Sequence, residues 1–397
     1  MPRVRRGRLA PVLVALLLVP APAAHGAQPP PLALEGPRLV ASGVPFELRG
    51  AGAPAGAVVR LEIRLRSRWA LLARARADDA GGFTRTVRPR RIRERHLLRA
   101  LSPDGRASGR VAVRSRDVTL AAVGDVNLGD APGALMAQRG LRHPWTSVAP
   151  ALRRSDIAFG NLECAVSTRG APVPKEFNFR GRPAALRVMS RFAGFDVLNL
   201  ANNHVGDYGT RALLDTVANV RRFGMTPVGA GGSLAAAARP RVVERLGLRV
   251  AFVGFSDILP ASFFATAGRP GTQAATVPAI ESSVRAARRR ADVVIATFHW
   301  GVERATVENG RQRAFADAAL GAGATAVIGA HPHVLQPIRR SGAHRLVAYS
   351  LGNFVFGAAS PGTTRTGILR LRLSGRGVEG SRFRPAVIEA TRPRLLG

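Results

Sequence analysis

The feature that most constrains the fold is a series of short, uninterrupted apolar runs that follow Asp117. Strands that are covered on both faces have this pattern, because no alternate residue has to reach solvent. Helix-like stretches lie between several of the runs, and the alternation of buried strands and helices predicts an α/β domain over residues 116–397. The runs are 118–123, 157–159, 197–200, 250–253, 293–296, 326–328 and 346–348, and the helix-like stretches include 210–222, 278–290 and 311–320.

Polar residues follow five of these runs at the point where each run ends. Because ligand sites in open α/β sheets form at the carboxyl ends of the strands, these residues are expected to meet at one edge. Carboxylates, amide oxygens and imidazoles together suit a borderline divalent metal such as Mn, Fe or Zn. These clusters supply more ligands than one tetrahedral ion needs, whereas two ions about 3.5–4 Å apart would use them all. The usual substrate of such a pair of ions is a phosphoester. The clusters are Gly124-Asp125-Val126-Asn127, Gly160-Asn161-Leu162-Glu163, Ala201-Asn202-Asn203-His204, Thr297-Phe298-His299-Trp300-Gly301-Val302-Glu303 and Gly329-Ala330-His331-Pro332-His333.

Taken singly, most members of these clusters also fit a structural role. Asp125 fits a turn or a helix N-cap, and Asn203 fits a turn. His299 fits a buried core histidine, and Glu163 fits a surface carboxylate. His331-Pro332-His333 has little structural use after a buried strand, and the joint placement of all these residues at strand ends favours the metal site.

Residues 27–115 have a different sequence pattern, with short runs of alternating polar and apolar residues between Gly, Pro and Asp turns. This pattern predicts a small, immunoglobulin-like β-sandwich domain. The segment is strongly basic, with 18 arginines against 7 acidic residues. A solvated face is one interpretation of this charge, and contact with an anionic envelope polymer is the other. The densest arginines are Arg85, Arg88, Arg90, Arg91, Arg93, Arg95 and Arg99, which surround a single acid, Glu94.

The first 26 residues have the layout of a secretory signal peptide. Four arginines precede an apolar run over residues 9–20, and small residues before Ala27 favour cleavage there. The run is short for a bilayer, which takes about 20 residues, so an uncleaved anchor is the less favoured alternative. No later segment has a transmembrane pattern, and we expect an exported protein that is extracellular or associated with the cell envelope.

The composition of the chain further limits the classes of function that it can have. The chain has 59 Lys and Arg residues against 25 Asp and Glu residues, for a net charge of +34, and Lys175 is its one lysine. Both GC-rich codon usage and a selected polyanion-binding surface account for this excess of arginine. Export and the lack of an aromatic stacking motif argue against a nucleic-acid binder. The one cysteine, Cys164, excludes a disulfide framework within the chain and is interpreted as a small buried residue, not a nucleophile.

A set of motifs over about residues 117–357 resembles the CapA family of capsule and poly-γ-glutamate synthesis proteins, within the calcineurin-like metallophosphoesterase superfamily. The resemblance implies a four-layer αββα sandwich with a dinuclear metal centre at the strand ends. The motifs are Gly124-Asp125-Val126-Asn127-Leu128-Gly129, Asn161-Leu162-Glu163, Asn199-Leu200-Ala201-Asn202-Asn203-His204 with Asp207-Tyr208-Gly209, Phe177-Asn178-Phe179-Arg180-Gly181-Arg182, His299-Trp300-Gly301, Gly329-Ala330-His331-Pro332-His333 and Tyr349-Ser350-Leu351-Gly352-Asn353-Phe354.

The resemblance also assigns roles to individual residues. His204 would donate a proton to the leaving group or stabilise charge on the phosphoryl oxygens, and Asp207 would orient it or cap a helix. Asn127, Arg180 and Glu303 are assigned to substrate binding. For the metal ligands, Asp125 and His333 would hold the first divalent ion, Asn203, His299 and His331 the second, and Glu163 would bridge them.

Two positions depart from the wider superfamily. Asn127 replaces the histidine of the common Asp-x-His pattern, and Glu163 replaces an aspartate. Both changes are typical of the CapA branch and argue against an ordinary protein phosphatase.

These observations lead to two hypotheses about function. The first is an exported, metal-dependent hydrolase of the phosphoesterase type that acts in the assembly, release or anchoring of an anionic polymer such as poly-γ-glutamate. The second is a non-catalytic, polyanion-binding envelope scaffold that keeps the metallophosphoesterase fold. For the remaining chain, residues 261–273 are expected to form a pocket loop, residues 366–373 a late strand, and residues 392–397 an irregular end.

Overall fold

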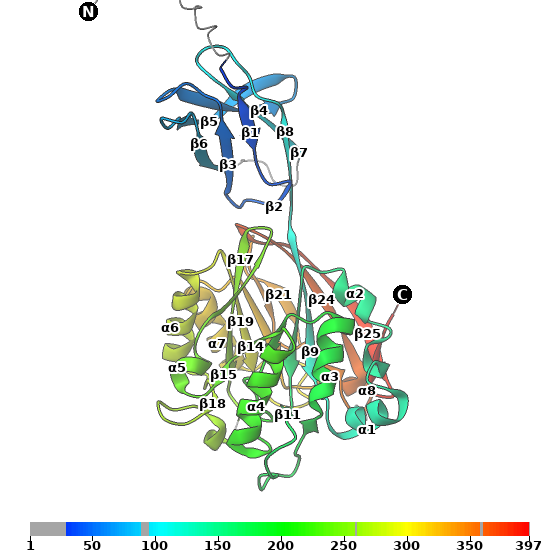
Figure 1. Cartoon of the computed structure of the whole chain (residues 1–397). Coiled ribbons are helices and arrows are strands. Elements are labelled where there is room, and N and C mark those ends of the chain that lie inside the picture. The colour runs from blue at the N-terminus through cyan, green and yellow to red at the C-terminus, as the bar shows by residue number, and fades with distance from the viewer. Residues whose placement is uncertain (1–28, 89–94, 259, 358–359, 397) are drawn as a thin grey trace, which may run out of the picture.

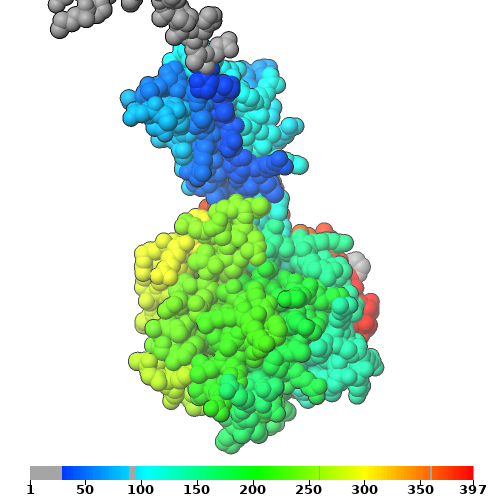
Figure 2. Space-filling view, viewed as in Figure 1, coloured from blue at the N-terminus to red at the C-terminus, as the bar shows by residue number. Residues whose placement is uncertain are grey.

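The computed structural model describes residues 29–88, 95–258, 260–357 and 360–396. The predicted signal peptide lies outside these residues, as do Arg90, Arg91, Arg93 and Glu94. The described chain forms a small N-terminal lobe and a larger C-terminal lobe, joined where β8 continues into β9 (Figures 1 and 2). In the part of the chain that is described, no helix is long and apolar enough to cross a membrane.

The N-terminal lobe consists of two β-sheets around a shared apolar core. Along its strands, buried residues such as Leu48, Leu61 and Leu98 alternate with exposed ones, as expected for sheets with one solvated face. One sheet has the order β1 (Ala33–Glu35), β3 (Phe46–Ala51) and β6 (Phe83–Val87), and the other has the order β2 (Leu39–Ala41), β8 (Val111–Arg116), β7 (Arg95–Leu101), β4 (Val58–Leu65) and β5 (Arg68–Arg76). The division of the chain into a sandwich domain and a second domain stays a prediction.

Contacts at the junction tie the two lobes together. The amide of Ala41 donates to the carbonyl of Leu246 at 2.8 Å, so β2 reaches the larger lobe. The Arg116 guanidinium, at the end of β8, donates twice to the Asp156 carboxylate, at 2.7 Å each. The backbone amide and hydroxyl of Thr119 add two further hydrogen bonds to that carboxylate. The junction is therefore held by backbone pairing and by a charged pair.

The larger lobe contains two mixed sheets that pack face to face, with helices on both outer faces (Figure 1). The first has the order β14 (Thr226–Val228), β13 (Val197–Asn199), β10 (Ile157–Leu162), β9 (Val118–Val126), β24 (Arg365–Ser374), β25 (Gly377–Glu389) and β26 (Arg392–Leu395), with β23 (Asn353–Val355) beside β9. The second has the order β16 (Arg241–Arg245), β17 (Leu248–Ser256), β19 (Val293–His299), β20 (Ala326–Ala330), β22 (Leu346–Ala348) and β21 (Ile338–Arg340).

Short elements and helices complete this lobe. The two-stranded pairs are β11 (Ala165–Val166) with β12 (Arg180–Gly181) and β15 (Ala230–Gly231) with β18 (Gly271–Thr272). The helices are α1 (Asp130–Arg139), η1 (His143–Trp145), α2 (Ala149–Arg153), α3 (Pro183–Val188), η2 (Met189–Ala193), α4 (Gly209–Arg222), α5 (Leu234–Ala237), η3 (Ala261–Phe263), α6 (Val277–Arg288), α7 (Gly310–Gly321) and α8 (Pro361–Thr364).

Local sequence explains where the long helices begin. At α7 the side chain of Asn309 accepts from the amide of Gln312, and the side chain of Gln312 accepts from the amide of Asn309, which forms a capping box. At α6 the hydroxyl of Thr276 accepts from the amide of Ala279, with a proline in the first turn. Their buried faces then pack against the second sheet.

The α/β prediction is confirmed, because each of the seven apolar runs lies in a β-strand of the larger lobe and the three helix-like stretches coincide with α4, α6 and α7. The predicted late strand is β24. The expectation of an irregular end was wrong, because β26 pairs with β25 through a turn at Ala390 and Thr391. The expected pocket loop contains η3 and β18, and β18 pairs with β15.

Candidate metal centre

The carboxyl ends of parallel strands from both sheets meet at one edge of the larger lobe, as the sequence predicts for a ligand site. The side chains that the sequence assigns to a metal centre lie there. Asp125 is near the end of β9, Glu163 follows β10, Asn203 follows β13, His299 ends β19, and His331 and His333 follow β20. All six are buried or nearly so.

Two glycines allow these strand ends to approach the loop after β22. A Cβ atom at Gly124 would lie 1.8 Å from the carbonyl oxygen of Gly352, and one at Gly329 would lie 2.0 Å from the carbonyl oxygen of Tyr349. The amide of Asp125 donates to the same Gly352 carbonyl at 2.9 Å. Glycine at both positions therefore brings the loop into contact with the strands that carry the site.

Glu163 lies at the centre of the group. Its Oε1 is 3.3 Å from His299 Nε2, 3.9 Å from His333 Nε2 and 4.0 Å from His204 Nε2. The side chain is fully buried, and within the described chain neither carboxylate oxygen has a hydrogen-bond partner. A buried carboxylate without such partners is expensive, so the surrounding imidazoles and a cation are the groups that would compensate it.

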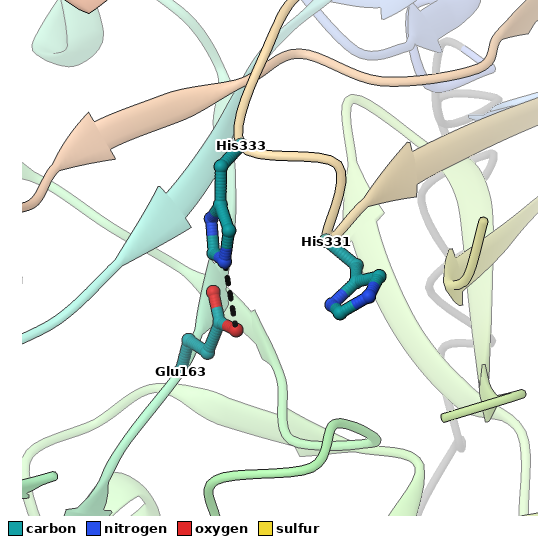
Figure 3. Close-up of side chains that lie close together, drawn as sticks. All are labelled: Glu163, His331 and His333. Carbon is teal, nitrogen blue, oxygen red and sulfur yellow. Dashed lines mark ion pairs between the residues drawn. The ribbon is translucent and has the colours of Figure 1, made fainter. Parts of the chain in front are cut away.

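The loop that carries His331 and His333 is shaped to present both rings (Figure 3). Both residues have a positive backbone angle φ, 99° for His331 and 58° for His333, which is uncommon for residues other than glycine. His333 Nδ1 lies 2.8 Å from Asn353 Oδ1 and 3.3 Å from Asp125 Oδ2. The Nδ1 atom of His331 is buried and has no partner among the residues described. Backbone strain of this kind is usual at functional sites.

Asparagines hold the other ligands in place. Asn161 Nδ2 donates to Asp125 Oδ1 at 2.8 Å and lies 3.2 Å from His299 Nδ1. Asn199 Nδ2 in turn donates to Asn161 Oδ1 at 2.8 Å. His299 Nε2 lies 2.8 Å from Asn203 Oδ1. This network fixes the carboxylate and the imidazole before any ion arrives, as second-layer hydrogen bonds do around metal ions.

The burial of so many ionisable groups shifts their proton affinities. Burial, with the Asp125 charge beside it, raises the pKa of Glu163 well above its usual range. Burial, with neighbouring imidazoles, lowers the pKa of His299 well below the ordinary value and that of His331 to about 3. For His333 burial acts in the same direction, but the hydrogen bond and charge of Asp125 outweigh it and raise the pKa. Neutral imidazoles with free lone pairs are the form that binds a metal ion.

These residues fit a divalent metal ion. Ligand atoms of Glu163, His331 and His333 lie within 4.8 Å of one another, and so do those of Asp125, Glu163 and His299. Glu163 belongs to both groups, which is the arrangement expected of a residue shared between two ions. Mixed carboxylate and imidazole ligands suit Mn, Fe or Zn.

A second hydrogen-bonded group borders the candidate ligands. His204 Nδ1 lies 2.7 Å from Asp207 Oδ2, and the fully buried Asp207 accepts a 2.7 Å hydrogen bond from Lys175 Nζ. Lys175 Nζ also lies 3.1 Å from Nδ1, but the Asp207 carboxylate is closer and only accepts, so we assign the hydrogen to Nδ1, and Nε2 faces Glu163. Phe179 stacks on the His204 ring, with centroids 4.3 Å apart. Burial lowers the pKa of His204, and Asp207 opposes that shift.

Asp207 is hydrogen-bonded to His204 and does not cap α4, because the N-cap residue of α4 is Tyr208, without a side-chain hydrogen bond. Lys175 was not predicted as a site residue. It also donates to the carbonyl of Asn203 at 2.6 Å, so it ties the histidine and a candidate ligand together. The sequence feature that could have pointed to Lys175 is compositional, since it is the one lysine of an arginine-rich chain.

The three predicted substrate residues lie in different surroundings. Asn127 is buried, its Oδ1 accepts from the amide of Gly129 at 2.8 Å, and its Nδ2 has no partner within the described residues. Arg180 is exposed on β12 and stacks over the Tyr208 ring at 4.2 Å. Glu303 is exposed on the loop after His299, close enough for its charge to raise the pKa of Glu163.

Cys164 is adjacent to the candidate site, but its surroundings do not activate its thiol. It is fully buried, and burial raises the pKa of its thiol to about 12. The thiol accepts from the amide of Leu128 at 3.4 Å. A neutral, buried thiol of this kind is a packing residue.

Comparison with known proteins places the site within a described family. The family described as bacterial capsule synthesis protein PGA_cap matches residues 119–358. The PGA biosynthesis protein CapA of Bacillus subtilis (strain 168) is 34% identical over 261 residues, which cover 65% of this chain and 67% of that protein. The capsule biosynthesis protein CapA of Bacillus anthracis is 32% identical over 259 residues, which cover 63% and 61%.

More distant similarities extend to a third relative and to solved structures. A probable polyglutamine synthesis accessory protein of Mycobacterium tuberculosis (strain ATCC 25618 / H37Rv) is 30% identical over 211 residues, covering 50% of this chain and 55% of that protein. The NAD nucleotidase of Haemophilus influenzae has a TM-score of 0.41 at 11% identity, covering 71% of this chain and 60% of that chain. The protein TT1561 of Thermus thermophilus has a TM-score of 0.37 at 13% identity, covering 67% and 99%.

Proposed function

Since the chain belongs to the bacterial capsule synthesis protein family PGA_cap, we propose that it is an exported, metal-dependent hydrolase of the phosphoesterase type. It would act in the biosynthesis, release or anchoring of an anionic capsular polymer such as poly-γ-glutamate. The observation that carries the proposal is the fully buried Glu163 carboxylate, which lies among imidazoles with neither oxygen hydrogen-bonded in the described chain.

The ligand set supports two divalent ions of the Mn, Fe or Zn type. Following the family resemblance, Asp125 and His333 would hold one ion, and Asn203, His299 and His331 the other. Glu163 would be a ligand of both ions. When bound, such a pair supplies Lewis acidity toward a phosphoryl oxygen and lowers the pKa of a bound water.

His204 is the residue best placed to move a proton. Its Nε2 faces the candidate ligands while Nδ1 is held by Asp207. An imidazole fixed in this tautomer can donate from Nε2 to a departing oxygen once protonated, or hydrogen-bond a phosphoryl oxygen. Phe179 covers one ring face, which keeps water from that side and restricts the ring to one orientation.

Two of the three predicted substrate residues, Asn127 and Arg180, offer donors of the kind an anion requires, whereas Glu303 is an acid and does not. The Oδ1 atom of Asn127 is already used by the backbone, so its remaining donor, Nδ2, suits an anionic oxygen and not a cation. The planar guanidinium of Arg180, which stacks on Tyr208, suits a carboxylate or phosphate group.

Elemental analysis and hydrolysis assays test this proposal on the chain from Ala27 onward. We expect about two equivalents of transition metal per chain, as a dinuclear site requires, and turnover of a generic phosphodiester or monoester with Mn, Fe or Zn. Asn203→Ala is expected to lower turnover at least about 100-fold. Asn219→Ala is the matched control, because that asparagine lies on α4 and hydrogen-bonds Val166 instead.

A folded protein that retains no metal after reconstitution would contradict the proposal, as would an Asn203→Ala variant with wild-type turnover. Export is tested separately by the intact mass of the protein from the native host. A mass that includes residues 1–26 would overturn cleavage of the signal peptide.

A further inference from the structure

The outer face of the five-stranded sheet in the N-terminal lobe carries a basic hollow that the metal centre does not use. The hollow has a volume of about 940 Å³. Among the described residues, it is lined by four exposed arginines and one exposed acid, Glu35. The arginines are Arg38, Arg95, Arg110 and Arg114, and we call this surface the arginine hollow. It lies outside residues 119–358, the part of the chain that matches the family.

Strand geometry explains why the arginines gather there. Along β8 the side chain of Val113 is buried in the lobe core and the flanking residues face outward, so Arg114 projects from the sheet. Arg95 on β7 is the direct cross-strand partner of Arg114. Arg38 is brought to the same place because its carbonyl accepts from the amide of Arg114 at 3.0 Å.

The charge of the arginine hollow is not compensated within the described chain. Like charges directly opposite each other destabilise a sheet. At one other place on this sheet an acid lies among the arginines, because Glu62 is opposite Arg99 and forms a 2.8 Å ion pair with it. Glu62 also lies 3.2 Å from Arg60. The four arginines of the hollow form no ion pair with any acid among the described residues, so an external anion would relieve their repulsion.

The spread of the charges indicates the size of that anion. Opposite residues on paired strands, such as Arg95 and Arg114, are about 5 Å apart, whereas residues four apart along an extended strand are about 13 Å apart. Arg110, which directly precedes β8, is four residues from Arg114. A single small anion cannot reach both ends of such a surface. A polymer with a charge on every unit can contact several guanidinium groups at once, each as a fork that matches a carboxylate.

We propose that the arginine hollow binds a polycarboxylate chain and holds it against the N-terminal lobe. The choice of a carboxylate polymer over a phosphate polymer rests on the proposed function, and the existence of the anion site does not. Because the hollow contains none of the candidate metal ligands, binding there does not depend on metal.

Titration of the chain from Ala27 with fluorescently labelled poly-γ-glutamate tests this proposal. The double substitution Arg95→Gln/Arg114→Gln is expected to weaken binding about tenfold and to reduce the dependence of log affinity on log salt by about two charges. The matched control is Arg74→Gln/Arg85→Gln, which removes two exposed arginines of the same lobe that do not line the hollow. The control is expected to change affinity less than about twofold.

Equal weakening by the two double variants would overturn the proposal, because it would mean that diffuse charge drives binding. No binding by the wild type would also overturn it, and tighter binding of polyphosphate or single-stranded DNA of matched charge would overturn the carboxylate assignment. EDTA is expected to leave polymer binding unchanged, so a failure of the hydrolase proposal would not be confused with a failure of this one.

A measurement on the wild type avoids any folding defect of the variants. Bound poly-γ-glutamate is expected to protect Arg95 and Arg114 from an arginine-specific dicarbonyl reagent, as mapped by mass spectrometry. Arg74 and Arg85 are expected to react at the same rate with and without polymer, and equal protection of all four would contradict a local site.

Discussion

Replacement of Glu163 by glutamine is expected to stabilise the metal-free protein and to remove most of the stability that metal adds. Without metal, the wild-type carboxylate is fully buried beside Asp125 with no hydrogen-bond partner in the described chain. An unsatisfied buried group costs about 1–3 kcal/mol, and more when it is charged. At alkaline pH, where Glu163 is ionised in spite of its raised pKa, a neutral amide of nearly the same shape relieves the like-charge contact, so we expect a gain of about 1–3 kcal/mol in EDTA.

With metal present the effect reverses. At a metal concentration 100 times the dissociation constant, binding adds about 2.7 kcal/mol to the wild-type free energy of unfolding. If loss of the shared ligand weakens binding 100-fold, the Glu163→Gln variant gains only about 0.4 kcal/mol under the same conditions. In a lobe of this size each kcal/mol shifts the melting temperature by about 2–4 °C. The two effects are therefore separable by thermal unfolding with and without Mn or Zn.

Glu308→Gln is the matched control for this experiment. Glu308 is also a buried carboxylate of the larger lobe, but it lies 3.0 Å from Arg339 and away from the candidate ligands. We expect the control to lose stability equally in EDTA and in metal, because it breaks an existing ion pair. A Glu163→Gln variant that is less stable than the wild type in EDTA, or that keeps the full metal increment, would refute the reasoning.

Three further predictions concern the residues that support the site. Lys175→Met is expected to destabilise the protein by about 1–3 kcal/mol, because the buried Asp207 then loses its partly buried cationic partner, and an unchanged urea midpoint would contradict this. Burial acts to raise the pKa of Asp156, but the hydrogen bonds from Arg116 and Thr119 together outweigh it and lower that pKa to about 2. The contribution of about 1–2 kcal/mol is therefore present above about pH 4 and is lost as the pH falls toward about 2, and the stability difference between wild type and Asp156→Asn should shrink over that range. Gly124→Ala is expected to cost at least about 2 kcal/mol in chemical denaturation, because its Cβ would meet a backbone carbonyl oxygen, and a neutral result would show that the loop can move.

The buried strands and the places of the candidate ligands at their carboxyl ends could be predicted from sequence, because both depend on local patterns, whereas the order of the strands within each sheet was not predicted. An apolar run such as residues 293–296 identifies a buried strand by itself, and His299 follows it within three residues. The rule that sites form at carboxyl ends of parallel strands then joins separate segments without knowledge of side-chain positions.

The supporting residues could not be predicted in this way, because their roles depend on contacts between distant segments. Lys175 lies in the loop between β11 and β12, and nothing near it in the sequence indicates that Asp207 will accept its hydrogen bond. Asn353 is likewise 20 residues from His333, which it contacts. Such pairs form only after the topology has brought their loops to the same edge.

The arginine hollow could not be predicted from the sequence either. In the sequence its arginines are indistinguishable from the many others of the lobe, and among the described arginines of the densest run, at residues 85–99, only Arg95 lines the hollow. Arg38 directly precedes β2, Arg110 directly precedes β8, and Arg114 lies within β8. The parallel pairing of β2 with β8, which alternation alone does not predict, puts Leu39 opposite Arg114 and so brings the neighbouring Arg38 to the same place. Net charge therefore indicated that an anion was a plausible partner, but the strand pairing determines which arginines can meet one.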